Sequence, residues 1–274
     1  MQETANLATR SASERKPLLR VDKLKKIYEG RTRTVEALRD LTFTVGDGEL
    51  VCIVGPSGAG KTTLLKCLSG LLSPTSGQIL LQDRPISGPP EAMALVFQEY
   101  GRSLFPWMTV EANVELPLKQ KGMQRDKRRK IVSEALENVG LGHVGGSYPW
   151  QLSGGMQQRV AIARAVAYQP KVLVMDEPFA AVDAQTRADL EDLIRTLWHR
   201  LGVTVLFVTH DIDEAVYLGE RVLALSSSPT IIMDDVTIDL PDERSQIETR
   251  SLPRFAELRR HLHEQIQRAK STTG

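Results

Sequence analysis

The sequence predicts an α/β fold with a mostly parallel sheet, and three features of the chain carry this prediction. Between residues 171 and 225, strand-like apolar runs alternate with helical patterns in a β-α-β-α-β order, which is typical of parallel strands covered by helices. Upstream, the apolar run at 50–54 predicts a fully buried strand that leads into a glycine-rich loop and a helical pattern. Residues 99–169 carry no strong strand signal and predict a mostly helical insertion.

The length and composition of the chain limit the classes of protein to which it can belong. The 274 residues suffice for one large domain or a core domain with a lobe attached. The 35 Lys and Arg residues nearly balance the 34 Asp and Glu residues, so bulk charge favours no nucleic-acid partner. Cys52 and Cys67 lie in apolar runs, and we expect buried thiols without a disulfide. The polar N-terminus lacks a signal-peptide pattern and no apolar run is long enough to span a membrane, so we expect a soluble chain that is not exported.

The ends of the chain differ in texture from the middle. Residues 1–17 are rich in Ser, Thr, Ala and charged residues and are predicted to be disordered. Short apolar runs separated by turns predict strands between residues 18 and 54. One domain is expected over 18–240, followed by a C-terminal tail at 241–274. After Pro253, apolar residues recur at spacings of three and four and predict an amphipathic helix in this tail: Phe255, Leu258, Leu262 and Ile266.

The first glycine-rich stretch, GPSGAGKT at 55–62, fits the pattern G-x-x-x-x-G-K-[ST] between a predicted strand and helix. In this context the loop N–H groups and the helix N-terminus face phosphates, Lys61 reaches the β- and γ-phosphates, and Thr62 can bind Mg²⁺. The simpler interpretation is a turn that only links strand to helix. We predict a nucleotide-binding loop formed by Gly55, Pro56, Ser57, Gly58, Ala59, Gly60, Lys61, Thr62 and Thr63.

The stretch KVLVMDEP at 171–178 reads as a buried strand that ends in two acids. Asp176 at the end of the strand is expected to hold Mg²⁺ through its hydration shell. Glu177 beside it is expected to accept a proton from an attacking water molecule. The alternative is a pair of surface acids that cap the following helix.

A second glycine-rich stretch, LSGGMQQR at 152–159, precedes a helical pattern. Ser153 is a plausible N-cap, and Gly154 and Gly155 leave the first N–H groups of the helix open to an anion. Because the first loop already encloses one side of a triphosphate, the second is most simply explained as a lid supplied by another copy of the chain. An ordinary serine-capped helix is the alternative.

GPSGAGKTT, KVLVMDEP and LSGGMQQR together resemble the Walker A, Walker B and signature motifs of the ATP-binding cassette (ABC) family, and the resemblance extends from about Leu18 to Ala224. It implies a P-loop NTPase core of the RecA-like type with an antiparallel β subdomain. It also implies that the helical subdomain, about residues 99–169, carries the signature motif. The expected ligands are ATP and Mg²⁺.

The resemblance implies roles for four further residues. Tyr28 resembles the aromatic residue that stacks on adenine, and Gln98 resembles the glutamine that contacts Mg²⁺ and water. His210 resembles the histidine that holds the γ-phosphate, and Asp183 resembles the D-loop aspartate, although Ala180 and Val182 depart from the usual Ser-Ala-Leu-Asp. Simpler interpretations are a strand-end tyrosine, a polar residue that ends a strand, and, for Asp183, a helix cap.

Five histidines compete for the role given to His210. We expect His210 to be shielded from solvent, because it closes a strand beside the predicted nucleotide site. The other four occur in helical or loop contexts and are expected to be solvated: His143, His199, His261 and His263.

By resemblance, two cassettes join head to tail around two ATP molecules, and Glu177, His210 and Lys61 support hydrolysis. Since the chain has no membrane span, the force is expected to reach separate transmembrane subunits, which places the chain on the cytoplasmic face of a membrane. Apolar residues after Gln98 are either the docking surface for those subunits or part of the core of the helical lobe: Leu104, Phe105, Trp107 and Met108. The basic cluster from Lys119 to Lys130 is either a lipid contact or a solvated helix face.

Three stretches, RSLFPWMTVEANV, THDIDEAVYLGERVLALSSSP and the tail with LPDE, resemble cassettes of the nitrate, sulfonate and taurine importer group. In that group a binding protein delivers the solute. The alternatives are an exporter cassette and a soluble ABC protein outside transport, although the single P-loop and the lack of heptads or a cysteine cluster do not favour the latter. A P-loop kinase would have no use for LSGG.

Overall fold

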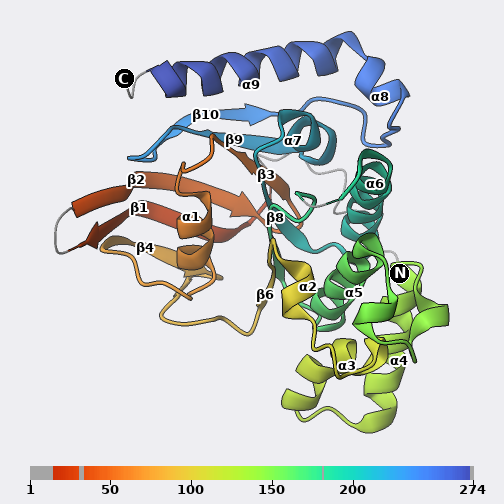
Figure 1. Ribbon diagram of the computed structural model, residues 1–274. Helices are drawn as coiled ribbons and strands as arrows, with labels where there is room; N and C mark the ends of the chain where they lie inside the picture. Colours follow the sequence, from red (N-terminus) through yellow and green to blue (C-terminus); the bar gives the residue numbers. More distant parts are fainter. Residues whose placement is uncertain (1–14, 31–33, 181, 272–274) are drawn as a thin grey trace. The chain divides into compact units, whose positions relative to one another are not determined.

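The computed structural model describes residues 15–30, 34–180 and 182–271, which form two compact units. Unit 1 combines the chain up to Pro90 with the chain from Trp198 onward, and unit 2 is Glu91–Leu197. Figure 1 shows the helices and strands of both units. The predicted helical subdomain, about 99–169, lies inside unit 2.

Unit 1 contains an antiparallel sheet in the order β2-β1-β4-β5. Its strands are β1 (Pro17–Glu29), β2 (Thr34–Gly46), β4 (Ser76–Leu81) and β5 (Arg84–Pro85). Leu19 and Val21 of β1 are fully buried, as the alternating pattern of a half-buried strand requires, and a register shift after Val21 brings Leu24 into the core as well. This sheet is the antiparallel subdomain implied by the family resemblance.

Unit 1 also contains strands in the order β10-β9-β3-β8. The parallel members are β3 (Leu50–Val54), β8 (Thr204–Thr209) and β9 (Arg221–Leu225), and β10 (Ile232–Thr237) pairs antiparallel to β9. All residues of β3 and β8 are buried, which explains their continuous apolar runs. Cys52 in β3 and Cys67 in the following helix are buried thiols that are not joined in a disulfide, and burial raises the pKa of Cys67 to about 11.

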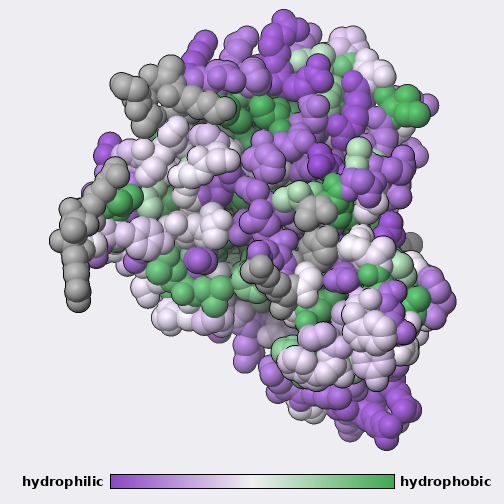
Figure 2. All heavy atoms as spheres, in the orientation of Figure 1, coloured by the Kyte–Doolittle hydropathy of each residue, from purple (hydrophilic) through white to green (hydrophobic). Residues whose placement is uncertain are grey.

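Helices α1 (Lys61–Leu68), α7 (Ile212–Leu218), α8 (Glu248–Ser251) and α9 (Pro253–Ser271) complete unit 1. Helix α9 packs on α7, β9 and β10 (Figure 1). The four apolar residues expected to line this helix are all buried. Hydrophilic side chains cover its outer face (Figure 2).

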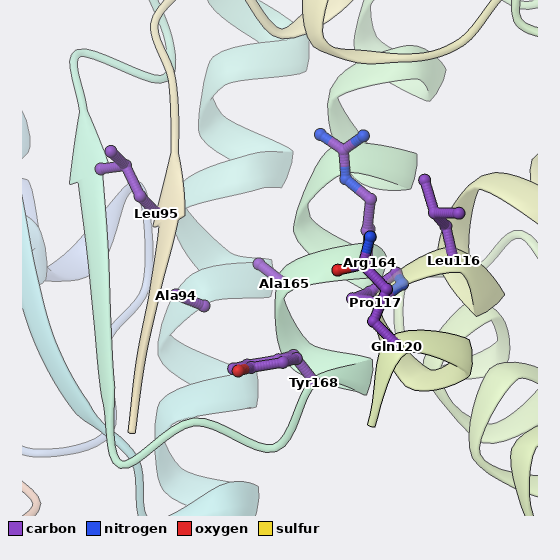
Figure 3. Close-up of a pocket in the computed structure, with 8 residues that line it drawn as sticks. All are labelled: Ala94, Leu95, Leu116, Pro117, Gln120, Arg164, Ala165 and Tyr168. Carbon is purple, nitrogen blue, oxygen red and sulfur yellow. The ribbon is translucent and has the colours of Figure 1, made fainter. Parts of the chain in front are cut away.

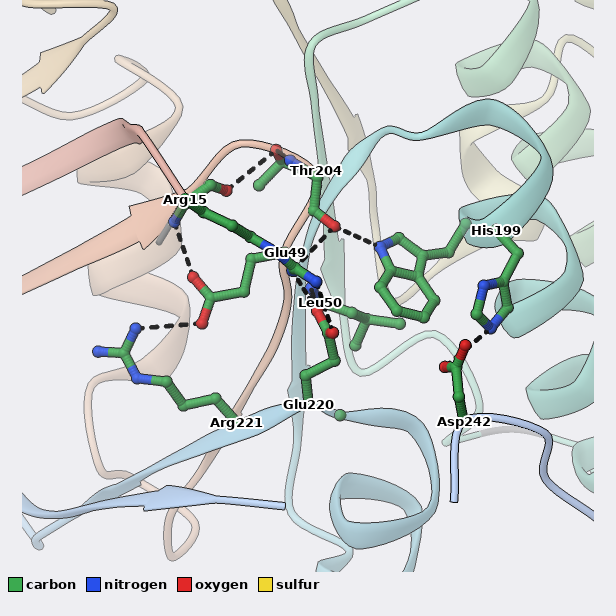
Figure 4. A network of polar contacts seen from close by, with 12 residues as sticks. Arg15, Glu49, Leu50, His199, Thr204, Glu220, Arg221 and Asp242 are labelled. Atoms are coloured by element: carbon green, nitrogen blue, oxygen red, sulfur yellow. Dashed lines mark hydrogen bonds and ion pairs between the residues drawn. The ribbon is translucent and has the colours of Figure 1, made fainter. Parts of the chain in front are cut away.

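Residues 1–14 of the tail predicted to be disordered lie outside the described residues. Arg15, by contrast, is buried, and β1 begins at Pro17. The Arg15 guanidinium donates to both carboxylate oxygens of Glu220, at 2.5 and 2.7 Å, while Arg221 pairs with the buried Glu49 at 3.2 Å (Figure 4). The Arg15–Glu220 ion pair attaches the start of the described chain to the rest of unit 1.

Unit 2 pairs two parallel strands, β6 (Met93–Val96) and β7 (Val172–Asp176), with a set of helices. Within the described part of the predicted insertion, residues 99–169 form helices and no strand. The helices are α2 (Tyr100–Ser103), α3 (Val110–Gln120), α4 (Arg125–Asn138), η3 (Gly142–Val144), η4 (Pro149–Gln151), α5 (Gly154–Ala167) and α6 (Ala184–Leu201), whose last turn belongs to unit 1. Helices α3, α4 and α5 pack on one another. The predicted fold class, α/β with parallel strands and an antiparallel sheet, is confirmed.

Candidate nucleotide site

The predicted phosphate loop lies in unit 1 between β3 and α1. Gly58 and Gly60 adopt left-handed backbone angles, φ 78° and 68°, which glycine tolerates best. A Cβ on Gly60 would lie 3.0 Å from Thr230 Oγ1 and 3.1 Å from the Ala37 carbonyl oxygen, so the loop also passes too close to its neighbours for a side chain. The local sequence therefore shapes the chain into a tight turn that ends at a helix N-terminus.

Lys61 is the first residue of α1, and its side chain is buried against the loop. Its ammonium donates to the carbonyl oxygens of Gly55 at 2.9 Å and Pro56 at 3.1 Å. Phosphate oxygens are stronger acceptors for a cation than neutral carbonyls, because the hydrogen bond is then charge-assisted on both sides. The loop thus holds a cation where the sequence pattern predicts the β- and γ-phosphates.

Tyr28 lies beside the same loop. Its hydroxyl is 3.2 Å from Thr63 Oγ1, the Lys26 ammonium is 5.5 Å from the ring centroid, and the side chain is 41% exposed. The structure therefore places a partly exposed aromatic ring next to the predicted phosphate loop. This is the arrangement that stacking on a base needs.

His210 follows β8 directly, as Gly55 follows β3. Val54 and Thr209 are paired in the parallel register, so the two following residues leave the sheet at the same edge. His210 is exposed in the single chain, and the expectation that it is shielded from solvent is wrong here. The other four histidines are also exposed; His199 and His261 contact Asp242 and Asp234 at 3.4 and 2.6 Å.

In unit 2, β7 ends at the first of the two predicted acids, Asp176, and Glu177 follows it. Asp176 is 8% exposed, and Glu177 has a left-handed backbone with φ 42°. A non-glycine residue in this region costs about 1–3 kcal/mol and persists only where its surroundings hold it, often at functional sites. Val96 and Met175 pair in the parallel register, so Gln98 and Asp176 leave the two strands at one edge.

The second glycine stretch forms the start of α5 in unit 2. Ser153 Oγ accepts a hydrogen bond from Met156 N at 3.3 Å, which confirms the predicted N-cap. Ser153 and Gly154 are exposed, and a Cβ on Gly155 would lie 2.6 Å from Thr186 Cγ2. The helix start is open to a ligand and closely packed on its inner side.

Asp183 is the residue before α6, and its carboxylate accepts from Thr186 N at 3.0 Å and Thr186 Oγ1 at 2.7 Å. These hydrogen bonds lower the pKa of the Asp183 carboxyl, because they favour its charged form. The simpler interpretation of Asp183, a helix cap, therefore describes its contacts within one chain. Thr186 lies between Asp183 and Gly155, so the starts of α5 and α6 are packed together.

Sequence reasoning missed Gln158 and Arg164, two residues of α5. Gln158 is fully buried and its amide donates to the Pro178 carbonyl, next to Glu177. Arg164 donates to the carbonyl and hydroxyl of Ser103 at 2.6 and 2.8 Å, which ties α5 to α2. The sequence could have pointed to these two residues by their position, because both polar side chains occur in a helix that is otherwise mostly Ala, Val and Ile.

A cavity of about 250 Å³ opens in unit 2 beside β6, α3 and α5 (Figure 3). Its lining is mixed in polarity: Ala94, Leu95, Leu116, Pro117, Gln120, Arg164, Ala165 and Tyr168. None of these residues is among the predicted nucleotide-binding residues. We therefore do not assign the nucleotide to this cavity.

The apolar residues after Gln98 were interpreted either as a docking surface or as part of the core of the helical lobe, and the structure divides them between these two. Leu104 is buried and belongs to the core of the lobe, while Trp107 is 72% exposed with its ring 5.4 Å from that of Phe105. In the basic cluster, Lys119 and Arg128 both pair with Glu115, at 2.8 and 2.9 Å. These pairs favour a solvated helix face over a lipid contact.

The comparisons with known proteins agree with this geometry. The family model described as "ABC transporter" matches residues 38–180. The nitrate import ATP-binding protein NrtD of Synechocystis sp. is 44% identical over 233 residues, 85% of this chain and 87% of the relative. The taurine import ATP-binding protein TauB of Yersinia pestis is 42% identical over 222 residues, 81% of this chain and 85% of the relative.

Among solved structures, the dimeric post-hydrolysis state of the ATP-binding cassette MJ0796 bound to ADP and Pi has a TM-score of 0.71 and 33% identity. The match covers 80% of this chain and 98% of that one. The glycine-rich loop that leads from β3 into α1 and carries Lys61 has the pattern of a P-loop nucleotide-binding protein. The chain belongs to the family of ATP-binding subunits of ABC transporters. The family resemblance is confirmed, and the chain is an ATPase. The helices of the described residues include none with the length and apolarity to cross a membrane.

Proposed function

We propose that this chain is the ATPase subunit of an importer, in which two copies enclose two ATP molecules and drive separate permease subunits in a membrane. The observation that carries this proposal is the presence in one chain of both anion-binding ends, the Lys61 loop and the Ser153 helix start. The relatives named above for nitrate and taurine import support the direction of transport. The chain would work at the cytoplasmic face of the membrane.

We assign the triphosphate to the loop from Gly55 to Thr63 in one copy and to Ser153, Gly154 and Gly155 of the other. Backbone N–H groups and the Lys61 ammonium neutralise the phosphates, and Tyr28 stacks on the base. We place Asp183 at the edge of the same interface between the two copies. Head-to-tail pairing follows, because each copy supplies a different half of every enclosure.

Thr62, Gln98 and Asp176 are the residues that would hold Mg²⁺. They offer a hydroxyl, an amide oxygen and a carboxylate, which are the hard oxygen donors that this ion prefers. When bound, Mg²⁺ neutralises charge on the transferred phosphoryl group. Glu177 accepts a proton from the attacking water, and His210 and Lys61 stabilise charge on the γ-phosphate.

The exposed aromatic residues that follow β6 are the proposed contact with the permease. Phe97 is 47% exposed and Trp107 is 72% exposed, and large exposed aromatic groups are typical anchors at protein interfaces. The solute itself would be a small anion or zwitterion such as nitrate, a sulfonate or taurine, brought to the permease by a binding protein. The cassette meets no solute, so its identity must come from experiment.

The test is to purify the full chain with its membrane subunits in lipid and to measure ATP hydrolysis. We expect a binding protein loaded with nitrate or taurine to raise the rate severalfold, and the unloaded binding protein to raise it less. Stimulation by free solute without any binding protein would favour an exporter instead. Failure to recover any membrane subunit with the chain would contradict the proposal.

A further inference from the structure

We propose that Gln158 is a positioning residue for ATP hydrolysis: its side-chain amide, from α5, fixes the turn that carries Glu177. This inference rests on the proposed role of Glu177 as the group that accepts the proton. Gln158 itself touches no reacting atom and acts through the main chain of the turn. Both residues belong to unit 2.

The burial of Gln158 is not explained by packing. The side chain is fully buried, Nε2 donates to the Pro178 carbonyl, and Oε1 has no hydrogen-bond partner among the described residues. A buried polar atom without a partner costs about 1–3 kcal/mol. An apolar side chain of the same length would suit this site better if stability were all that mattered. The one bond that Gln158 makes is therefore the feature that requires a function.

That bond acts on a short segment with little remaining freedom. Asp176 ends the buried strand β7, and Phe179 is 1% exposed, so the turn is anchored on both sides. The ring of Pro178 fixes its own φ. Fixing the direction of the Pro178 carbonyl then restricts its ψ as well. Because Pro178 follows Glu177 directly, its fixed backbone helps to keep Glu177 in the left-handed conformation, φ 42°.

The helix that supplies the amide begins at Ser153, the proposed anion-binding end. Gln158 lies on the second turn of this helix, and Arg164 further along ties the same helix to Ser103 of α2. Through Gln158, the segment that would touch the γ-phosphate of one ATP is joined to the segment that would activate water at the other. The position of the carboxylate thus depends on the position of α5.

The test compares Gln158→Met with the wild-type full chain. Methionine has a similar length but cannot donate to the Pro178 carbonyl. We expect kcat to fall by about 10- to 100-fold, since small displacements of a catalytic group have effects of this size. The Kd for ATP should stay within about threefold, because no phosphate contact is removed. The melting temperature should be unchanged or higher, so that a lower rate does not reflect unfolding.

Lys121→Met is the matched control. The Lys121 ammonium donates to the Tyr168 carbonyl at 2.9 Å, so this change also removes a side-chain bond to a backbone carbonyl at α5, at its far end. We expect its kcat to stay within about twofold of wild type. Hydrogen exchange gives a second readout: the amides of Glu177, Phe179 and Ala180 should exchange faster in Gln158→Met and not in Lys121→Met.

Gln158→Glu provides a conservative variant if the methionine variant does not fold. A buried carboxyl has a raised pKa, up to about 8–9, and only its protonated form can donate to the carbonyl. Its rate relative to wild type should therefore be higher at about pH 6 than at about pH 9. A wild-type kcat for Gln158→Met, or unchanged exchange of those three amides, would overturn the positioning role. Rapid hydrolysis by Glu177→Gln would instead overturn the role of Glu177.

Discussion

At the scale of single residues, Lys61 is the side chain on which the proposed binding of nucleotide depends most directly. Its ammonium is buried and bound to two carbonyl oxygens of its own loop, so the cation is already in place. The motif identified the residue from spacing alone. The two carbonyl partners were not predictable, because they depend on the turn that the loop adopts without ligand.

We predict that Lys61→Ala weakens ATP binding by about 10- to 100-fold, the value of a charge-assisted hydrogen bond of about 1.5–3 kcal/mol. Isothermal calorimetry on the full chain measures this directly. Lys66→Ala is the control, because Lys66 is an exposed cation on the same helix. Equal affinities for wild type and Lys61→Ala would remove the assignment of the phosphate loop.

At the scale of elements, the starts of α5 and α6 are coupled by one contact. The Asp183 carboxylate caps α6 by accepting from Thr186 N and Oγ1, while the methyl group of Thr186 lies against Gly155. Gly155 and Thr186 are 31 positions apart and belong to separate motifs in the sequence. In the structure, the two motifs form one packed junction in unit 2.

We predict that Gly155→Ala destabilises the chain without nucleotide by about 1–3 kcal/mol, the usual cost of overpacking. A Cβ at 2.6 Å from Thr186 Cγ2 forces the helices apart, and this outweighs the better helix propensity of alanine. Thermal or denaturant unfolding gives the free energy.

Thr186→Ser tests the cause of that loss, because serine keeps the hydroxyl bonded to Asp183 and lacks the methyl group. We expect Gly155→Ala to be close to neutral in the Thr186→Ser background. The same loss in both backgrounds would show that the contact with Thr186 is not responsible.

The elements themselves followed from local patterns. The buried strand at 50–54, the serine cap at 153 and the apolar face of the C-terminal helix were all predictable from periodicity and cap chemistry. The contacts of Gln158 and Thr186 were not, because they join segments that meet only in the folded chain. The prediction that His210 is shielded from solvent was wrong because a position at the end of a buried strand, beside the predicted nucleotide site, does not by itself bury the side chain.

At the scale of the whole molecule, the proposed enclosure of ATP needs a second copy. The related cassette MJ0796 is dimeric with ADP and Pi bound, which supports this expectation. In this chain Ser153, Gly154 and His210 are among the predicted site residues that are exposed and so accessible to a partner.

We predict that Glu177→Gln binds ATP, hydrolyses it at least about 100-fold more slowly, and accumulates as a dimer, since loss of a general base blocks the step that reopens the pair. Size-exclusion chromatography with light scattering measures the mass with and without ATP. The double variant Lys61→Ala with Glu177→Gln should remain monomeric. A Glu177→Gln chain that stays monomeric with saturating ATP would contradict the head-to-tail pairing.

The unusual backbone of Glu177 also bears on how this protein could be engineered. Asparagine and glycine adopt that conformation more readily than glutamate, so either one should relieve local strain and raise heat resistance. A laboratory selection for heat resistance alone would then favour them at position 177 and, under the proposed role of Glu177, would yield proteins that do not hydrolyse ATP. Any such selection should retain growth on the transported nutrient as a second requirement.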